Sequence, residues 1–308
     1  MRRIVPVDNS CVTLPGPWQH RLVRASGAQF HVAQAGTLKE DRPLILLIHG
    51  FPEYWYAWRH QIPALAEAGY AVAAMDVRGA GGSDRTRHTF DTPTLANDVI
   101  GVIRAVGASK AILVGTGSGG ALAWSAASLA PSLIAGVATI SAPHPVDTFR
   151  LGLHVTFRTW RHYLSAFLPQ LAEKSLTSRD KLKKLLAAVS APGNRGAVEA
   201  VDYYSQALQL PNAAKTQLQQ LQWTWGMTRR PSGRKHLDKL SSPLNIPVLT
   251  VRGDLDPLLP TRAWASTKKH VAADYRHVVL PDTGYLAHEE NPDEINRLLL
   301  EFLAEHAS

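Results

Sequence analysis

A glycine-rich stretch at residues 114–120 has the pattern of a turn that presents a catalytic nucleophile. An apolar run at 111–114 predicts a strand before it, and a helical pattern follows it. Such a strand–turn–helix holds a Ser, Cys or Asp on a strained turn, which leaves room only for small residues two positions to either side. Gly115 and Gly119 have the spacing of those flanking residues. The residue between them is Gly117, which has no side chain and cannot attack a substrate.

Two further motifs follow predicted strands. The strand Leu44–Ile48 is followed by His-Gly-Phe-Pro-Glu at 49–53, and a second strand is followed by Asp-Val-Arg-Gly-Ala-Gly-Gly-Ser-Asp at 76–84. Both closely resemble signatures of epoxide hydrolases in the α/β-hydrolase family; the first is specific, and the second occurs across the wider family. The resemblance runs from about Trp18 to the C-terminal helix and weakens across 145–243. It implies an α/β-hydrolase fold.

The resemblance also implies a set of catalytic positions. In epoxide hydrolases an aspartate attacks the epoxide carbon to form an ester, a histidine held by a second acid activates water to hydrolyse it, and two cap tyrosines polarise the epoxide oxygen. The motifs place the nucleophile at Gly117, the second acid at Asp256 and the histidine at Tyr285. A tyrosine, with a pKa near about 10, is a poor base at neutral pH. We therefore expect a degraded triad without standard epoxide hydrolase activity.

Asp256, at the acid position, has a second interpretation, and Asp147 is a second candidate for the acid. Asp256 precedes Pro257, and an aspartate in that setting also stabilises a turn. Asp147 is a weaker candidate, because some relatives place the acid after the preceding strand.

An active hydrolase of the esterase type is the alternative function. A shift of the turn by one residue would make Ser118 the nucleophile, with His288 as base and Asp256 as acid. For this alternative, Ser118 and His288 must both act from positions shifted relative to the family motifs. The geometry of the side chains, and not their presence in the sequence, decides whether they form a triad. Outside such a triad, we expect His288 at the surface or at the start of a helix.

Three residues are expected around the pocket in the unshifted register. The resemblance implies that the backbone N–H groups of Phe51 and Ser118 form the oxyanion hole. It also implies that Trp55, with Trp58, lines or supports the pocket rim. Tyr203, Tyr204 and the tryptophans of the cap are expected mainly to pack the cap against the core.

Alternating strand and helix patterns predict a mostly parallel sheet with helices on both faces. An inserted helical cap interrupts the alternation. We expect the first part of the core at 18–144, the cap at 145–243 and the second part of the core at 244–308. The predicted strands lie at 44–48, 71–75, 111–114, 134–140, 246–253 and 275–280 after an opening hairpin, with core helices at 55–68, 94–106, 119–130 and after residue 291.

The positive charge is concentrated in the cap. The net charge is +8, yet residues 150–240 carry 15 basic and 5 acidic side chains, or +10, which leaves −2 for the rest of the chain. A solvated helical surface explains this pattern, and attraction to an anionic surface or an acidic partner is the sharper interpretation. No nucleic-acid-binding motif accompanies the charge, so no nucleic-acid partner is expected.

The remaining expectations concern ligands and location. We expect a small apolar molecule in the cap–core pocket, no cofactor, and no metal, because no histidines have a metal-binding spacing. No apolar run of about 18 residues predicts a membrane span. The single cysteine, Cys11, mildly favours the cytoplasm over an oxidising compartment.

Overall fold

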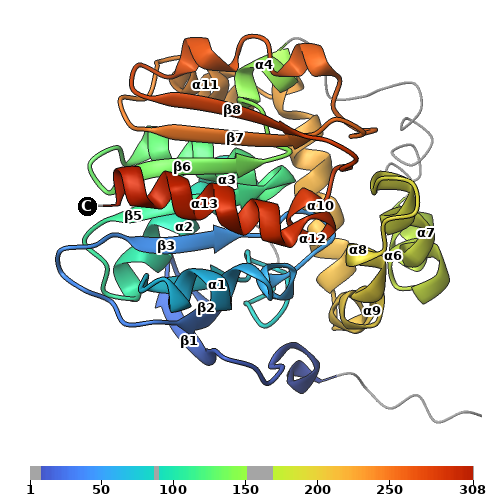
Figure 1. Ribbon diagram of the computed structural model, residues 1–308. Helices are drawn as coiled ribbons and strands as arrows, with labels where there is room; N and C mark the ends of the chain where they lie inside the picture. The colour runs from blue at the N-terminus through green and yellow to red at the C-terminus, as the bar shows by residue number, and fades with distance from the viewer. Residues whose placement is uncertain (1–7, 87–89, 151–168, 308) are drawn as a thin grey trace, which may run out of the picture.

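The computed structural model describes residues 8–86, 90–150 and 169–307 (Figure 1). Its centre is an eight-stranded sheet with the strand order β1-β2-β4-β3-β5-β6-β7-β8. β1 pairs with β2, and β2 with β4, in antiparallel fashion, and the other neighbours are parallel. The strands are β1 (Gln19–Ala25), β2 (Ala28–Ala35), β3 (Leu44–Ile48), β4 (Val72–Met75), β5 (Ala111–Thr116), β6 (Ile134–Ile140), β7 (Val248–Gly253) and β8 (Tyr275–Leu280).

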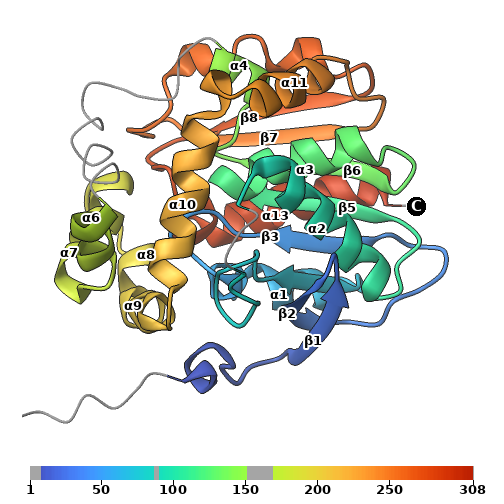
Figure 2. The ribbon, with the colours of Figure 1, turned by 180° about the vertical axis from the view of Figure 1, so that it is seen from behind.

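Helices cover both faces of this sheet. α1 (Gln61–Glu67) and α13 (Pro292–His306) lie on the face toward the viewer in Figure 1, and α2 (Thr92–Ala105) and α3 (Gly117–Leu129) lie on the face toward the viewer in Figure 2. Every residue of β3 and β5 is buried between these layers. Strands covered on both faces read as continuous apolar runs, which is why the sequence located them. The predicted α/β fold is confirmed.

The sequence predicts a single helix at 55–68, and this is wrong because the structure has two separate helical elements there. A 3-10 turn, η2 (Trp55–Trp58), precedes α1. Pro63 lies in the first turn of α1, where a proline is tolerated because its missing N–H has no partner in the helix. The helix therefore starts only at Gln61, and η2 directs Trp55 and Trp58 inward as fully buried side chains.

The helices between β6 and β7 occupy the stretch for which a cap was predicted. Both views place α6–α9 beyond the carboxyl ends of the central strands, whereas α11 packs against α3 (Figures 1 and 2). The α11–α3 contact includes a buried hydrogen bond of 3.0 Å between His236 Nε2 and Ser125 Oγ. The helices are α4 (Pro145–Arg150), α6 (Pro169–Leu176), α7 (Arg179–Val189), α8 (Gly196–Glu199), α9 (Val201–Gln209), α10 (Ala213–Trp225) and α11 (Pro231–Leu240).

Short elements complete the chain. They are η1 (Asn9–Val12), η3 (Met227–Arg229), η4 (Thr261–Ala263), η5 (Thr267–His270) and α12 (Ala287–Glu290). Within the described residues, no helix combines the length and the apolar character that crossing a membrane would require. The cytoplasmic location expected from the composition stays a prediction.

Candidate active site and cap cavity

The turn between β5 and α3 has the geometry that the glycine pattern predicts. Gly117 adopts a left-handed backbone conformation with φ of +49° and is the first residue of α3. A Cβ atom on Gly115 would overlap the carbonyl oxygen of Gly119, and one on Gly119 would overlap the carbonyl oxygen of Ile48. Glycine is therefore required at both flanking positions. The structure places Gly117 at the tip of the turn and Ser118 one residue into the helix.

The side chain of Tyr285 fills the space in front of Gly117. A Cβ atom on Gly117 would overlap the phenolic oxygen of Tyr285 and lie 3.1 Å from its Cζ atom. The sequence assigned these residues to the nucleophile and histidine positions, and the structure brings them into direct contact. The volume that a nucleophilic side chain on residue 117 needs is occupied by the Tyr285 hydroxyl.

The loop that carries Tyr285 is tied to both the core and the cap. The Tyr285 backbone N–H donates to the carbonyl of Val189 in α7, at 2.9 Å. The Glu290 carboxylate accepts hydrogen bonds from the backbone N–H groups of Gly284 at 2.8 Å, Leu286 at 3.0 Å and Ala191 at 2.8 Å. One half-buried carboxylate thus fixes the loop on either side of Tyr285 and attaches it to the cap.

Asp256 lies in the turn after β7, and its two carboxylate oxygens have different surroundings. Its Oδ1 accepts from the N–H groups of Leu258 at 2.7 Å and Leu259 at 3.2 Å. Its Oδ2 is buried and has no partner among the described residues. Burial raises the pKa of Asp256 to about 7, although the two N–H donors oppose that shift. Asp256 therefore fulfils the turn interpretation through Oδ1, and its Oδ2 remains available to a hydrogen-bond donor.

The sequence predicts His288 at the surface or at the start of a helix, and the predicted exposure to solvent is wrong. His288 lies in α12 but is fully buried, and its Nε2 lies 3.1 Å from Oε1 of Glu53. Glu53 also accepts from the N–H of Gly50 at 3.2 Å. The structure therefore engages His288 with the His-Gly-Phe-Pro-Glu motif and does not bring it to Ser118 or Asp256.

A cavity of about 710 Å³ separates the cap from the core, with Gly117, Ser118 and Tyr285 in its wall. Among the described residues, no histidine and no carboxylate lines it, and the charged lining consists of Lys181 and Lys184. Most of the remaining wall is apolar and comes from both sides; it includes Phe51, Ala121, Pro143, Leu185, Leu186, Val189, Leu218, Leu221, Trp225, Leu258 and Leu286.

Two of the three expected pocket residues line this cavity, and Trp55 does not. Phe51 and Ser118 contribute to the wall. Trp55 is fully buried, and its indole N–H donates to the Val12 carbonyl at 2.7 Å. Of the two roles expected for Trp55, lining the pocket is excluded, because η2 turns this ring into the core, where it packs edge-on against Trp18. Support of the rim stays a prediction.

Glu289 joins cap and core through an ion pair and a hydrogen bond that no sequence motif predicted. Glu289, fully buried, forms an ion pair of 3.0 Å with Arg59 and accepts a hydrogen bond from the hydroxyl of Tyr204 in α9. Burial raises the pKa of Glu289, and the neighbouring guanidinium opposes that shift. Tyr203 packs on Tyr56 at 4.6 Å between ring centroids. Neither cap tyrosine lines the cavity, which agrees with the packing role expected for them.

Comparison with known proteins decides the family. The family model for the alpha/beta hydrolase fold matches residues 43–292. This chain belongs to the α/β-hydrolase family. It is 32% identical to epoxide hydrolase B of Mycobacterium tuberculosis, over 92% of this chain and 98% of that protein. It is 29% identical to epoxide hydrolase A of the same species, over 92% and 96%.

A solved structure supports the same assignment. The crystal structure of epoxide hydrolase A from Mycobacterium thermoresistibile superimposes with a TM-score of 0.76 at 27% identity, covering 94% of this chain and 99% of that one. This α/β-hydrolase thus resembles epoxide hydrolases in both sequence and fold.

The contact between Gly117 and Tyr285 predicts a measurable energetic coupling. We expect Gly117→Ala to destabilise the protein through its left-handed backbone, by about 1–2 kcal/mol, and additionally through overlap with the tyrosine hydroxyl. In a Tyr285→Phe background that hydroxyl is absent, so the cost should fall by about 1 kcal/mol. Urea unfolding of the four proteins in this double-mutant cycle measures the coupling.

A matched control separates backbone strain from the contact. Gly107 has φ of +91° and open space around its Cα, so Gly107→Ala introduces strain without overlap. Its effect should be the same with Tyr285 or with Phe at that position. Additive effects of Gly117→Ala and Tyr285→Phe would show that the two residues do not touch.

The half-buried Asp256, whose Oδ2 atom is inaccessible to solvent, predicts a pH-dependent stability. Its folded-state pKa of about 7 exceeds the unfolded value of about 3.9, so the folded state binds the proton more tightly. Wild-type stability from this group therefore falls as the pH rises between those two values. Asp256→Asn cannot ionise, and its stability relative to wild type should increase from pH 5 to pH 8 in urea unfolding. A flat Asp256→Asn profile would contradict the assignment.

Proposed function

We propose that this protein does not hydrolyse epoxides and instead binds a small apolar molecule in the cavity between cap and core. The observation that carries the proposal is the Tyr285 hydroxyl in the space that a side chain on Gly117 would occupy. A covalent mechanism requires a nucleophile and a base within hydrogen-bond reach of each other. Gly117 supplies no nucleophile, and tyrosine is a poor general base at neutral pH.

The state of Asp256 supports the same proposal. In the family mechanism an acid at this position holds the catalytic histidine. Here its Oδ2 is buried without a partner in the described part of the chain. A buried carboxylate oxygen without a donor is unfavourable, so its retention fits a site whose histidine has been replaced by Tyr285.

The esterase alternative is less well supported. His288 would have to give up its 3.1 Å contact with Glu53, inside the core, to reach Ser118 in the cavity wall. A serine-directed fluorophosphonate tests this alternative directly, and we expect no stoichiometric modification of Ser118.

The cavity has the size and lining of a ligand site. Pockets for small molecules measure roughly 300–1,000 Å³ and are mostly apolar with a few polar groups. The polar groups in this wall include the side chains of Ser118, Ser141 and Tyr285. A small, mainly apolar molecule is therefore the proposed ligand.

Wild-type protein should show no turnover of aryl or alkyl epoxides above buffer. Removal of such catalytic groups lowers rates by several orders of magnitude, about 10⁴ to 10⁶-fold for triad residues. The assay follows diol formation by chromatography. Turnover that survives repurification and disappears in Asp256→Ala would contradict the proposal.

A restoration series provides the positive control for this assay. Gly117→Asp alone should stay inactive or give at most one stoichiometric burst, because the new carboxylate overlaps Tyr285 and its ester has no histidine to hydrolyse it. Gly117→Asp with Tyr285→His removes both obstacles, and weak multiple turnover is expected. Multiple turnovers from Gly117→Asp alone would mean that another base, such as His288, serves the site.

Ligand binding is tested with N-phenyl-1-naphthylamine, a neutral dye whose fluorescence increases in apolar surroundings. We expect saturable binding to wild type. Leu185→Trp should weaken it by about tenfold, or about 1.4 kcal/mol, because Leu185 lines the cavity. Leu171→Trp, on the 57% exposed Leu171 of the neighbouring cap helix, should bind as wild type does. Equal binding by all three proteins would place the dye elsewhere.

A second candidate function is docking of the basic cap on an anionic membrane surface. Four exposed basic residues gather on η3 and α11, and none forms an ion pair with a described residue. Each Lys or Arg near an anionic membrane contributes on the order of 1 kcal/mol. The four residues are Arg229, Arg230, Arg234 and Lys235.

Charge reversal tests this docking. Changing all four residues to Glu should abolish cosedimentation with vesicles containing phosphatidylserine and leave thermal unfolding nearly unchanged. Binding by wild type should weaken with salt, since the Debye length is ~8 Å at physiological ionic strength. A control with the same change in net charge reverses four exposed core residues, Arg21, Arg24, Arg104 and Lys110. Failure of wild type to bind at low salt would rule out docking.

A further inference from the structure

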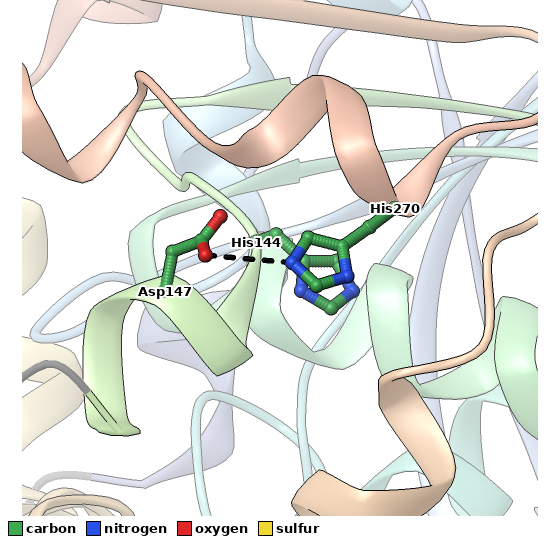
Figure 3. A group of neighbouring side chains, drawn as sticks. All are labelled: His144, Asp147 and His270. Atoms are coloured by element: carbon green, nitrogen blue, oxygen red, sulfur yellow. Dashed lines mark hydrogen bonds and ion pairs between the residues drawn. The ribbon is translucent and has the colours of Figure 1, made fainter.

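Three buried side chains from distant parts of the chain meet where the chain passes from the core into the cap. His144 follows β6, Asp147 lies in the first turn of α4, and His270 ends η5; Figure 3 shows the three side chains converging. His270 Nε2 lies 3.4 Å from Asp147 Oδ1, and the two imidazole rings are stacked with centroids 3.7 Å apart. One ligand atom from each residue lies within 4.8 Å of the other two.

We propose that His144, Asp147 and His270 bind a first-row transition-metal ion, with Zn²⁺ as the best match, and that the ion fastens η5 to the start of α4. Imidazole nitrogens with a carboxylate oxygen form a donor set typical of Zn²⁺, and three protein ligands leave a fourth position for water. Mg²⁺ and Ca²⁺ prefer oxygen ligands alone and fit this set poorly.

The spacing fits a shared ion better than a direct hydrogen bond. Ligand atoms that lie about 2.0–2.1 Å from Zn²⁺ in a tetrahedral arrangement are about 3.4 Å apart. The distance between His270 Nε2 and Asp147 Oδ1 is 3.4 Å. A charge-assisted hydrogen bond between an imidazolium and a carboxylate is shorter, at about 2.7–2.9 Å.

The cluster also leaves one coordinating atom without a partner. Oδ2 of Asp147 is buried and makes no hydrogen bond to any described residue. Buried polar atoms are rarely left unpaired, and an ion held by the Asp147 carboxylate is one physical explanation for it. The side chain of His270 is 11% exposed, compared with 7% for Asp147, so an ion can approach past His270.

One ring must turn for the ion to bind. The imidazole planes differ by 11°, so a single ion cannot lie in both planes as they stand. His144 is the more constrained ring, since it accepts from the N–H of Val146 at 3.3 Å and packs edge-on against Trp124. When His270 tilts it loses its stacking on His144 and the 3.4 Å contact with Asp147, and coordination of the ion by both residues replaces these contacts.

A second buried group, formed by Glu53, His288 and Glu289, has comparable spacing but is already neutralised. Glu289 is paired with the Arg59 guanidinium at 3.0 Å, and Glu53 accepts from both His288 and Gly50. A fixed positive charge beside the group repels a divalent cation. The His144–Asp147–His270 group has no such ion pair with a described Lys or Arg.

Calorimetric titration tests the site. Tag-free protein, first treated with a chelator, is titrated with ZnCl₂ near neutral pH, and we expect saturable binding of one ion. Asp147→Asn and His270→Phe should each weaken it by at least about tenfold, because lost ligand support commonly costs 10–100-fold in affinity. His270→Phe keeps a ring to stack on His144. His60→Phe, at an exposed histidine outside the cluster, should bind as wild type does.

A spectroscopic readout on wild type keeps the test decisive if a variant fails to fold. Co²⁺ bound to a tetrahedral site with nitrogen and oxygen ligands absorbs visible light, and Zn²⁺ should displace that signal at one equivalent. No saturable binding of Zn²⁺ up to about 100 µM, no visible absorption with Co²⁺, or undiminished binding by folded Asp147→Asn and His270→Phe would each overturn the proposal.

Discussion

The contact between the Tyr285 hydroxyl and Gly117 is the constraint on which the rest of the site depends. The tight turn after β5 excludes side chains at Gly115 and Gly119, so residue 117 is the position from which the turn would present one. With glycine there, the turn keeps its strained geometry without presenting a reactive group. The side chain of Tyr285 fills the space in front of Gly117. Gly117 and Tyr285 are therefore sterically complementary, and a side chain added at residue 117 would overlap the tyrosine.

This contact is also coupled to the position of the cap. The loop around Tyr285 is held by Glu290, whose carboxylate accepts backbone N–H groups from that loop and from Ala191 after α7. The next residue along, Glu289, binds Arg59 of the core and Tyr204 of the cap. Two adjacent carboxylates, the buried Glu289 and the half-buried Glu290, thus join cap, core and the tyrosine loop. A cavity wall held in this way is preorganised, which lowers the entropic cost of binding a ligand.

The sequence predicted the core and the positions of the site residues for identifiable reasons. β3 and β6 coincide with the predicted ranges, because apolar runs bounded by Gly, Pro or polar residues mark buried parallel strands. β8 coincides as well, although it is an edge strand that carries Arg276 and His277 and is mostly part-exposed. The motif spacing indicated Gly117, Tyr285 and Asp256 as site positions, and the structure brings Gly117 and Tyr285 into contact. The motif does not reveal that the Tyr285 hydroxyl fills the Gly117 space, since that depends on how a loop from the end of the chain packs against the cap.

The environments of the histidines were not predictable, because they depend on distant contacts. His288 lies in a four-residue helix, too short for an apolar periodicity, and is buried through a partner 235 residues away, Glu53. His270 and Asp147 are 123 residues apart and belong to no recognised metal-binding spacing. Trp55 was expected at the pocket, but the break between η2 and α1 turns it into the core. Local sequence patterns determine helices and strands. The contacts of His288 with Glu53 and of His270 with Asp147 form only when the sheet brings distant segments together.

A crystal structure of the wild-type protein that resolves the Tyr285 side chain tests the central claim most directly. The account predicts the tyrosine hydroxyl against the Cα of Gly117, a left-handed Gly117 at the tip of the turn, Ser118 within α3 and His288 bonded to Glu53. A structure in which Tyr285 turns away from Gly117, or in which Ser118 occupies the tip with His288 beside it, would contradict the account.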